Sequence, residues 1–388
     1  MADKTLYITA IRRTHFGNEH GMIRFKRGAD GKLTPDLSIA EKYLDLAVKH
    51  QGKIPGVILY CWEPPDSMGH AGTGPKRIHD REILVTIAGP DGKLEKAKGP
   101  EWGTEQCRAF WQRLSTAVKG MLRKRGMEKS LMFGLIGDHR PTKRAIQEIG
   151  TGAPDVKWAV HSHNYCDKWQ GADVGMCIAL WGVRCYPADP DRGRGYGWRN
   201  PFWLALYPRN QMSIGSPLVD HRMQAENQLG AIPASLSRWS NAKGLHGIGR
   251  IGADFWPAAK DKRGRLSTIA GRYPETYWGQ LCLNYCVPSV LGKGAKGPVP
   301  SVRSEAFREN VQECEARIFI ERALTDEARK ARLGDDLAGR CRAALDVRIR
   351  TCLYSVGKGW TWFVSSGWAE RNRLLFDLAA EVQKKIGE

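Results

Sequence analysis

An α/β fold built on a parallel sheet is what the sequence of 388 residues predicts. Short apolar, β-branched or aromatic runs alternate along residues 1–325 with longer segments of helical period. The runs are almost continuously apolar, which is typical of strands that are buried on both faces. No glycine fingerprint follows the first run, so a TIM-type (β/α)8 barrel is favoured over a doubly wound sheet.

The predicted strands number eight, as a closed barrel requires. They are Thr5–Ile11, Gly56–Trp62, Leu131–Gly137, Val156–His161, Gly175–Trp181, Phe202–Tyr207, Gly247–Ala253 and Gln280–Cys286.

Helical segments follow several of these runs. Ser38 and Glu41 have the spacing of a capping box, and the next helix has one apolar face, made by Ile39, Tyr43, Leu46 and Ala47. A second helix carries Phe110, Leu114, Ala117, Val118, Met121 and Leu122 on one face. Pro141 is expected to open a third.

Two domains are expected, a barrel over residues 1–325 and a helical extension over 326–388 that packs on it. The longest amphipathic stretch, 303–324, belongs to the barrel, and the last helix is marked by Leu374, Leu378, Val382 and Ile386. Segments 64–103 and 183–200 are predicted as long loops, because they are rich in Gly, Pro and charged residues.

The charge balance is unusual: 60 Lys and Arg against 41 Asp and Glu give a net charge of +19. Such a field attracts anions, and nucleic acid or an anionic glycan are the natural candidates, although cations dispersed for solubility would give the same total. No nucleic-acid module is recognisable, so no nucleic-acid partner is expected.

Cofactors and metals are not expected. The ten cysteines are scattered, without a CxxC pair or a paired Cys/His set, and are interpreted as reduced core residues. The glycine-rich segment 292–297 lacks the phosphate-loop spacing and is interpreted as a turn. No apolar window is long enough to span a bilayer, and the start, Met-Ala-Asp-Lys, lacks the apolar stretch of a signal peptide.

Polar residues at the ends of barrel strands are the functional candidates, because loops at that edge are open while the strand interior is packed. Asp138 follows the apolar third strand and is the best-placed carboxylate for glycosidic bond cleavage, although a helix cap before Pro141 is the alternative. His139 and Glu63 are further catalytic candidates. Candidates for sugar binding by stacking or hydrogen bonding are Trp62, His163, Tyr207, Arg209, Asp254, Trp256, Asn284 and Tyr285.

Several segments resemble glycoside hydrolase family 123. They are Gly297-Pro-Val-Pro-Ser-Val-Arg-Ser-Glu-Ala-Phe-Arg-Glu-Asn-Val-Gln-Glu-Cys-Glu-Ala-Arg-Ile, Arg250-Ile-Gly-Ala-Asp-Phe-Trp and the strand that ends at Gly137-Asp138. The resemblance implies a β-N-acetylgalactosaminidase-type reaction, in which the acetamido oxygen of the substrate attacks the anomeric carbon. It also implies an adjacent Asp-Glu pair, with the Asp orienting the acetamido group and the Glu acting as the acid.

This sequence has Asp138-His139 where the resemblance implies Asp-Glu, so the aspartate carries over and the acid does not. His139 could serve as the acid, or Glu63 or Asp254 could reach in from another strand. The expected function is therefore a divergent glycoside hydrolase acting on a glycan that is possibly anionic or N-acetylated. The alternative is a glycan binder without catalysis. The sequence as written is expected to remain cytoplasmic, whereas members of that family are often exported, and the oligomeric state is left open.

Overall fold

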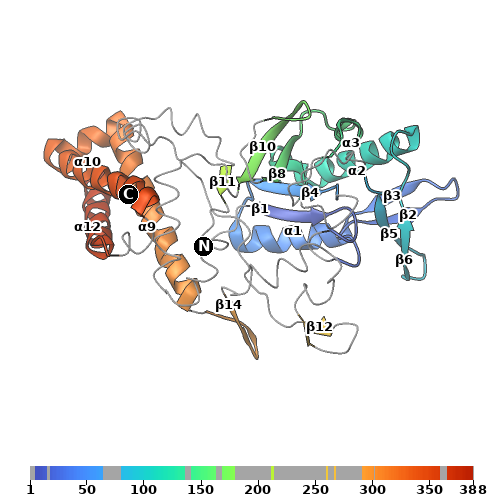
Figure 1. The fold of residues 1–388 in the computed structure, drawn as a ribbon, viewed down its shortest axis with the longest axis horizontal. Helices are drawn as coiled ribbons and strands as arrows, with labels where there is room; N and C mark the ends of the chain where they lie inside the picture. Colours follow the sequence, from blue (N-terminus) through green and yellow to red (C-terminus); the bar gives the residue numbers. More distant parts are fainter. Residues whose placement is uncertain are drawn as a thin grey trace.

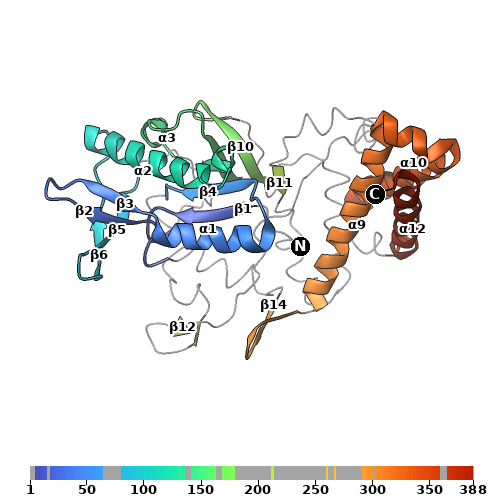
Figure 2. The same ribbon diagram turned by 180° about the vertical axis from the view of Figure 1, so that it is seen from behind.

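The computed structural model describes residues 5–14, 18–63, 80–135, 141–162, 168–179, 211–213, 259–260, 266–267, 291–300, 302–358 and 365–387. Figure 1 shows the path of the chain, and Figure 2 shows it from behind. The described residues form a main sheet with helices, a smaller sheet beside it, and three long helices near the C-terminus.

The main sheet is parallel and follows chain order. Its strands are β1 (Thr5–Thr9), β4 (Gly56–Tyr60), β7 (Leu131–Gly134), β8 (Lys157–Ser162), β10 (Ala172–Ala179) and β11 (Gln211–Ser213). Each pairs in parallel with the next, and the short β9 (Lys168–Trp169) is antiparallel to β10. A doubly wound sheet reverses its order at a switch point, whereas the strands that the structure describes show no reversal.

Five of the eight predicted strands are confirmed in position, with ends that shift by a few residues: β1, β4, β7, β8 and β10. The predicted strands at 202–207, 247–253 and 280–286 lie outside the described residues. The closed barrel therefore remains a proposal, and what the structure shows is a parallel α/β sheet in the strand order that a barrel needs.

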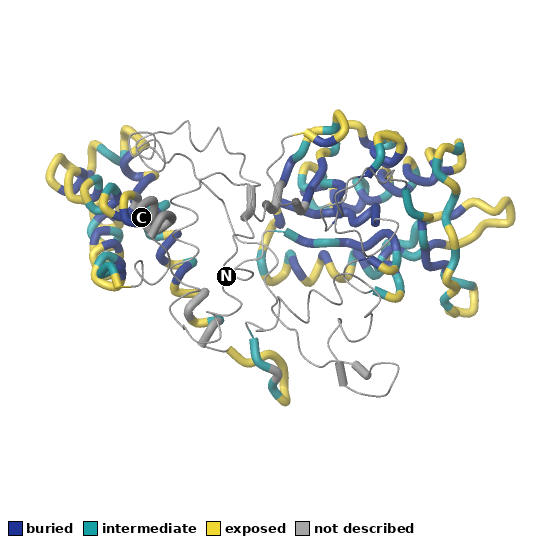
Figure 3. Tube along the Cα trace, in the orientation of Figure 1, coloured by how far each residue is buried: buried dark blue, intermediate teal, exposed yellow. Residues whose placement is uncertain are grey.

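Helices α1 (Ser38–Gln51), α2 (Glu105–Arg123) and α3 (Lys143–Gly150) pack on one face of this sheet. Alternate strand residues such as Val57, Leu59 and Phe133 face that shared core, which is dark blue in Figure 3. Residues between them, including Ile58, form a second small cluster with Ala159 and Met176 on the other face.

Gly134 is the point of closest packing on that second face. A Cβ at this position would lie 3.0 Å from the carbonyl oxygen of Ala159 and closer still to the side chain of Ile58. A side chain there would push β7 away from both neighbours. The glycine thus permits the close approach of β4, β7 and β8.

A smaller sheet, the rim sheet, is built from the segments after β1 and β4. Its strands β2 (Arg24–Arg27), β3 (Leu33–Asp36), β5 (Leu84–Ala88) and β6 (Leu94–Lys98) run in the order β3-β2-β5-β6. The expected loop at 64–103 therefore contains a hairpin, β5–β6, in its second half.

The two hairpins of the rim sheet share one turn, Gly-x-Asp-Gly-Lys-Leu, at 28–33 and again at 89–94. In each, the aspartate side chain accepts from the lysine backbone N–H, at 3.1 Å and 3.0 Å, and Gly31 and Gly92 have positive φ. A strand, a hairpin and a helix thus occur twice in succession at the start of the chain. That repeat was not anticipated from the sequence.

Three helices near the C-terminus share a core of their own. They are α9 (Val302–Thr325), α10 (Glu327–Lys358, interrupted at Gly334) and α12 (Trp368–Ile386). Figures 1 and 2 show them at the opposite end of the long axis from the rim sheet. Helix α9 packs against α10 and α12 and shares their apolar core.

This helical core contains a buried polar network. Arg348 donates to Glu313 and, at 2.9 Å, to Asn372, while Asn372 donates 3.0 Å to Glu313. The guanidinium also lies 4.2 Å from the ring centroid of Trp368. Among the helices that the structure describes, none is long and apolar enough to cross a membrane.

Three details of the expected helices are wrong. Ser38 is not a side-chain cap, since α1 begins after Leu37 without a capping hydrogen bond. The buried face of α1 is Ala40, Leu44 and Ala47, whereas Tyr43 and Leu46 are exposed. Leu374 is also exposed, and Leu375 takes its place in the core.

The remaining small strands are β12 (Ala259–Lys260), β13 (Leu266–Ser267) and the hairpin β14 (Leu291–Gly294) with β15 (Gly297–Pro300), which contains the expected glycine turn.

Candidate functional site

The carboxyl ends of the first three main-sheet strands lie side by side. Thr9 pairs with Tyr60, and Tyr60 pairs with Gly134. The pairing continues past the strand ends, since the N–H of Ala10 donates 3.0 Å to Tyr60 and that of Cys61 donates 3.2 Å to Gly134. The segments that follow β1, β4 and β7 therefore start from one edge of the sheet, which we call the strand-end edge.

Glu63 is the described carboxylate that lies at this edge directly after a strand. Only 7% of it is exposed, and its Oε2 accepts a 2.7 Å hydrogen bond from the hydroxyl of Tyr60, itself fully buried in β4. A carboxylate held by a buried tyrosine on a rigid strand has a fixed direction. This geometry suits a group that must meet a substrate atom at short range.

Trp62 points away from solvent and is held by the next segment of the chain. Its indole Nε1 donates 3.0 Å to Oδ1 of Asp80, and 1% of the residue is exposed. The same oxygen accepts 3.2 Å from the N–H of Thr142, whose hydroxyl contacts Oδ2. No open ring face for stacking on a sugar is therefore presented by Trp62.

Asp80 thereby connects two segments of the strand-end edge. Thr142 is the N-cap of α3, because its Oγ1 accepts 3.2 Å from the N–H of Ala145. Pro141, expected to open that helix, instead precedes its cap. Residues 136–140, which include Asp138 and His139, lie between the buried Leu135 and this fixed cap but outside the described residues.

The loop after β1 brings three arginines close together. Burial, and then the charges of Arg13 and Arg81, lower the pKa of Arg12, while the charge of Glu19 opposes the shift. Arg12 and Arg13 lie in the segment after β1, and Arg81 follows Asp80 in the chain. The three arginines thus lie close to one another in the segments that follow β1 and β4.

Most of the predicted site residues lie outside the described part of the chain, so the structure does not bring them to the edge or remove them from it. Besides Asp138 and His139, these are His163, Tyr207, Arg209, Asp254, Trp256, Asn284 and Tyr285.

Sequence reasoning missed Tyr60, Asp80 and the arginines. Tyr60 looked like strand core, and Asp80 sits in a segment that gave no periodic signal. The rule that polar residues follow strand ends would have found Arg12 and Arg13, since they come directly after the apolar run that ends at Ile11.

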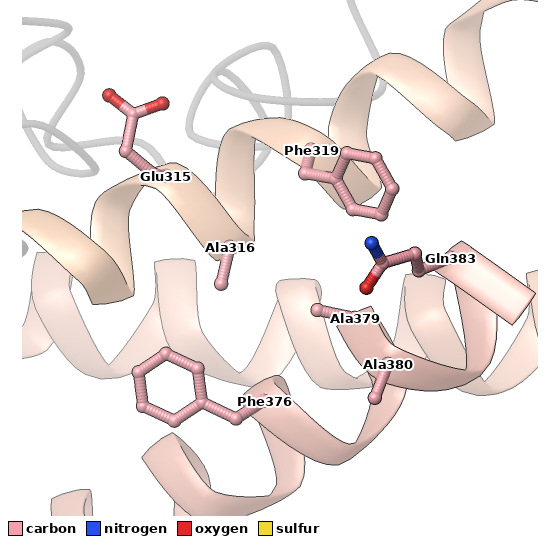
Figure 4. A pocket seen from close by; sticks show the side chains of 7 residues that line it. All are labelled: Glu315, Ala316, Phe319, Phe376, Ala379, Ala380 and Gln383. Carbon is pink, nitrogen blue, oxygen red and sulfur yellow. The ribbon is translucent and has the colours of Figure 1, made fainter. Parts of the chain in front are cut away.

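Among the described ranges, no group of three or more His, Cys, Asp or Glu residues could hold a metal ion. A groove of about 390 Å³ lies between α9 and α12, where Phe319, Phe376 and Gln383 line it (Figure 4). None of its lining residues comes from the main sheet, so it is separate from the strand-end edge.

The described residues thus define a protein of the α/β class, with a parallel sheet in sequential order and polar groups at the carboxyl edge of that sheet. The solved structures include a similar protein, a family 123 glycoside hydrolase from Clostridium perfringens that has been analysed for glycolipid glycan hydrolysis. The TM-score is 0.53 at 12% sequence identity, over 99% of this chain and 62% of that one.

This similarity establishes a distant glycoside hydrolase-like fold, and the chain spans less than two thirds of that enzyme's length. No protein-family model matches the sequence, and no curated protein matches it.

Proposed function

We propose that the protein is a divergent glycoside hydrolase that takes a glycan at the strand-end edge, with Glu63 and Asp138 as its catalytic carboxyl groups. The observation that carries the proposal is Glu63, which is almost fully buried at the end of β4 and is oriented by Tyr60 at 2.7 Å. The glycoside hydrolase-like fold supports the glycan as the ligand.

Cleavage of a glycosidic bond needs one group to protonate the leaving oxygen and another to act at the anomeric centre. In the proposal Glu63 donates its proton to the glycosidic oxygen as the bond to the anomeric carbon breaks. The acetamido oxygen of an N-acetylated sugar forms the new bond to that carbon, and Asp138 orients the acetamido N–H. A water molecule then opens this intermediate, and Glu63 takes back a proton from the water.

Glu63 is proposed as the acid because His139 stands where the resemblance implies a glutamate. A carboxyl group from the neighbouring strand could supply the proton from the same edge, since β4 and β7 pair directly. Trp62 and Asp80 are assigned a positioning role, because their hydrogen bond links the segment after β4 to the cap of α3.

The second candidate function is a glycan binder that does not cleave. The observation that favours it is the same replacement, Asp138-His139 in place of an Asp-Glu pair. A binder raises its melting temperature with a glycan but releases no reducing sugar.

The test is reducing-sugar release from oligosaccharides that contain N-acetylhexosamine, by the wild type and by Glu63→Gln, Asp138→Asn and His139→Gln. The matched control is Glu82→Gln, because Glu82 is an exposed carboxylate of the rim sheet region that pairs with Lys98 at 2.5 Å. Release that is lost in Glu63→Gln and Asp138→Asn, and kept in His139→Gln and Glu82→Gln, is the expected result.

Loss in His139→Gln with full activity in Glu63→Gln would transfer the role of the acid to the histidine. A melting shift without release would establish the binder. If no glycan in the panel gives either release or a saturable melting shift, the proposed function is wrong.

A further inference from the structure

Helices α9, α10 and α12, which we call the helical unit, carry a groove that the proposed function does not use. Three of its lining residues are alanines, Ala316, Ala379 and Ala380. Phe376 lies at one end of the groove and Gln383 at the other, as Figure 4 shows, and 37% of Phe376 is exposed. A hollow with small side chains beside an exposed aromatic ring suits contact with a second protein surface.

The groove side of α12 is one continuous stripe. Phe376, Ala380 and Gln383 follow one another at intervals of four and three residues, so they lie on one face of the helix. The residues that α12 buries in the helical core, such as Leu375 and Leu378, lie on a separate face. Because α12 has 19 residues and is about 28 Å long, its stripe offers a second helix a long contact that leaves the core undisturbed.

Two opposite charges flank this stripe. Asp377 and Lys384 are exposed on α12, seven residues or about two turns apart. Neither forms an ion pair within the described part of the chain, and Glu381, which lies between them in sequence, is paired with Arg340 at 2.6 Å. Charges at the border of a contact surface select the partner and its orientation.

The stripe and its charges are self-complementary in one arrangement. Asp377 is three residues before Ala380, and Lys384 is four residues after it. When two copies of α12 run antiparallel about a twofold axis near Ala380, Asp377 of each copy therefore faces Lys384 of the other. The same axis brings Phe376 of each copy to the Gln383 end of the other copy's groove. The small side chain of Ala380 lets the two helices approach closely.

The charge of the helical unit also favours a second copy as the occupant of the groove. Residues 302–388 contain 16 Lys and Arg against 14 Asp and Glu, although the chain as a whole has a net charge of +19. Two nearly neutral surfaces meet without strong repulsion, whereas a nucleic acid or another polyanion is attracted to a basic surface. The groove therefore suits a copy of its own surface better than an anionic partner.

We propose that the stripe of α12 and the groove beside it form a twofold interface through which the protein dimerises. Phe376 of each copy fills the other copy's groove near Phe319 and Gln383, and Asp377 pairs with Lys384 of the second copy. This inference is independent of the proposed function, because no residue of the strand-end edge takes part. A contact between one helix and one groove is smaller than a standard interface, so the dimer exchanges with the monomer.

The test is sedimentation velocity of the full chain and its variants, from about 1 to 100 µM, the range that a weak interface of this size requires. Phe376→Glu places a charge in the groove, and Ala380→Arg makes two like charges meet across the axis. The matched control is Leu374→Glu, because Leu374 lies on the same helix, is 49% exposed and does not line the groove.

Charge reversal tests the antiparallel arrangement itself. Asp377→Lys and Lys384→Asp each place like charges opposite one another, and the double variant D377K/K384D restores opposite charges. Each single reversal should weaken the dimer about tenfold, because the symmetry counts every pair twice. The double variant should dissociate with nearly the constant of the wild type.

The wild type and Leu374→Glu are expected to dimerise equally, and Phe376→Glu and Ala380→Arg to remain monomeric. Thermal unfolding of each variant verifies that it is folded, and Ala380→Arg decides the result if Phe376→Glu does not fold.

A wild type that stays monomeric over the whole concentration range would overturn the inference and leave the groove to a different partner. Dimerisation that persists in both Phe376→Glu and Ala380→Arg, or an equal loss in Leu374→Glu, would overturn it as well, because the interface would then lie elsewhere. A double reversal that binds no more tightly than the single ones would overturn the antiparallel arrangement and the inference with it.

Discussion

The hydroxyl of Tyr60 donates a 2.7 Å hydrogen bond to Oε2 of Glu63, three residues further along the chain. Tyr60 is the last residue of β4, and neither side chain is accessible to bulk water to any large extent. The strand therefore supplies both the carboxylate at its end and the donor that orients it. Loss of that donor should alter the site without rearranging the sheet.

Tyr60→Phe is expected to reduce glycan hydrolysis or binding while the protein remains folded. The free energy of unfolding should fall by about 1–2 kcal/mol, because a buried acceptor loses one of its partners. Urea unfolding and reducing-sugar release measure the two effects. The control is Leu46→Ala on the exposed side of α1, which should change neither. Full function in Tyr60→Phe would contradict the orienting role.

Gly134→Ala should destabilise the main sheet, by about 1–3 kcal/mol, because a Cβ there overlaps Ile58 and lies 3.0 Å from the carbonyl of Ala159. Gly120→Ala gives the matched comparison, since a Cβ at this position in α2 meets nothing within 4 Å. Helix propensity should make it more stable by about 0.5–1 kcal/mol. In urea unfolding, the free energy of unfolding should fall in Gly134→Ala and rise in Gly120→Ala. An unchanged free energy in Gly134→Ala would mean that β4, β7 and β8 are packed more loosely.

Comparing two threonine N-caps distinguishes the stability that a helix cap contributes from the stability that the contact with Asp80 contributes. Thr104 caps α2 through a 3.1 Å bond from Cys107, and Thr142 caps α3 through a 3.2 Å bond from Ala145. Each Thr→Val change should cost about 1 kcal/mol of stability from the cap alone. Thr142→Val should cost about 1 kcal/mol more, because it also removes the hydrogen bond from the Thr142 hydroxyl to Asp80. The same change should weaken glycan binding. A double-mutant cycle with Asp80→Asn measures this coupling, and a coupling energy of zero would separate Asp80 from the cap.

Cys61 should resist alkylation in the folded protein. Burial raises the pKa of its thiol to about 12, with a weaker opposing effect of the hydrogen bond to Gly134. The thiolate is the reactive form, so almost none is present below pH 9. N-ethylmaleimide at pH 8 followed by peptide mass mapping should leave Cys61 unmodified until guanidinium is added. Rapid native modification would show that this end of β4 opens to solvent.

The strand pattern was predictable because burial on both faces leaves a continuous apolar run in the sequence. The runs beginning at Thr5, Gly56 and Leu131 identify β1, β4 and β7, and their order follows from the alternation with helices. Helix faces were less predictable. Leu374 and Leu375 are adjacent leucines, so hydrophobicity does not distinguish them. Only the packing of α12 decides that Leu375 is the buried one.

The rim sheet and most of the site could not be predicted in the same way. β2 and β6 are largely exposed and charged, so they carry no burial signal, and only the repeated Gly-x-Asp-Gly-Lys-Leu turn points to them. Tyr60 is hidden among the apolar residues of a strand, and Asp80 contacts Trp62 and Thr142, which are distant from it in sequence. Glu63 was predicted, because its position directly after an apolar run was visible in the sequence itself.

We propose that Glu63 and Asp138 face one another at the strand-end edge. The most direct test is the distance between their carboxyl carbons in a crystal structure with a glycan bound. We expect a separation of about 5–9 Å, the range within which carboxyl pairs cleave glycosidic bonds. A separation well beyond that range, with Asp138 turned toward the outer helices, would contradict it.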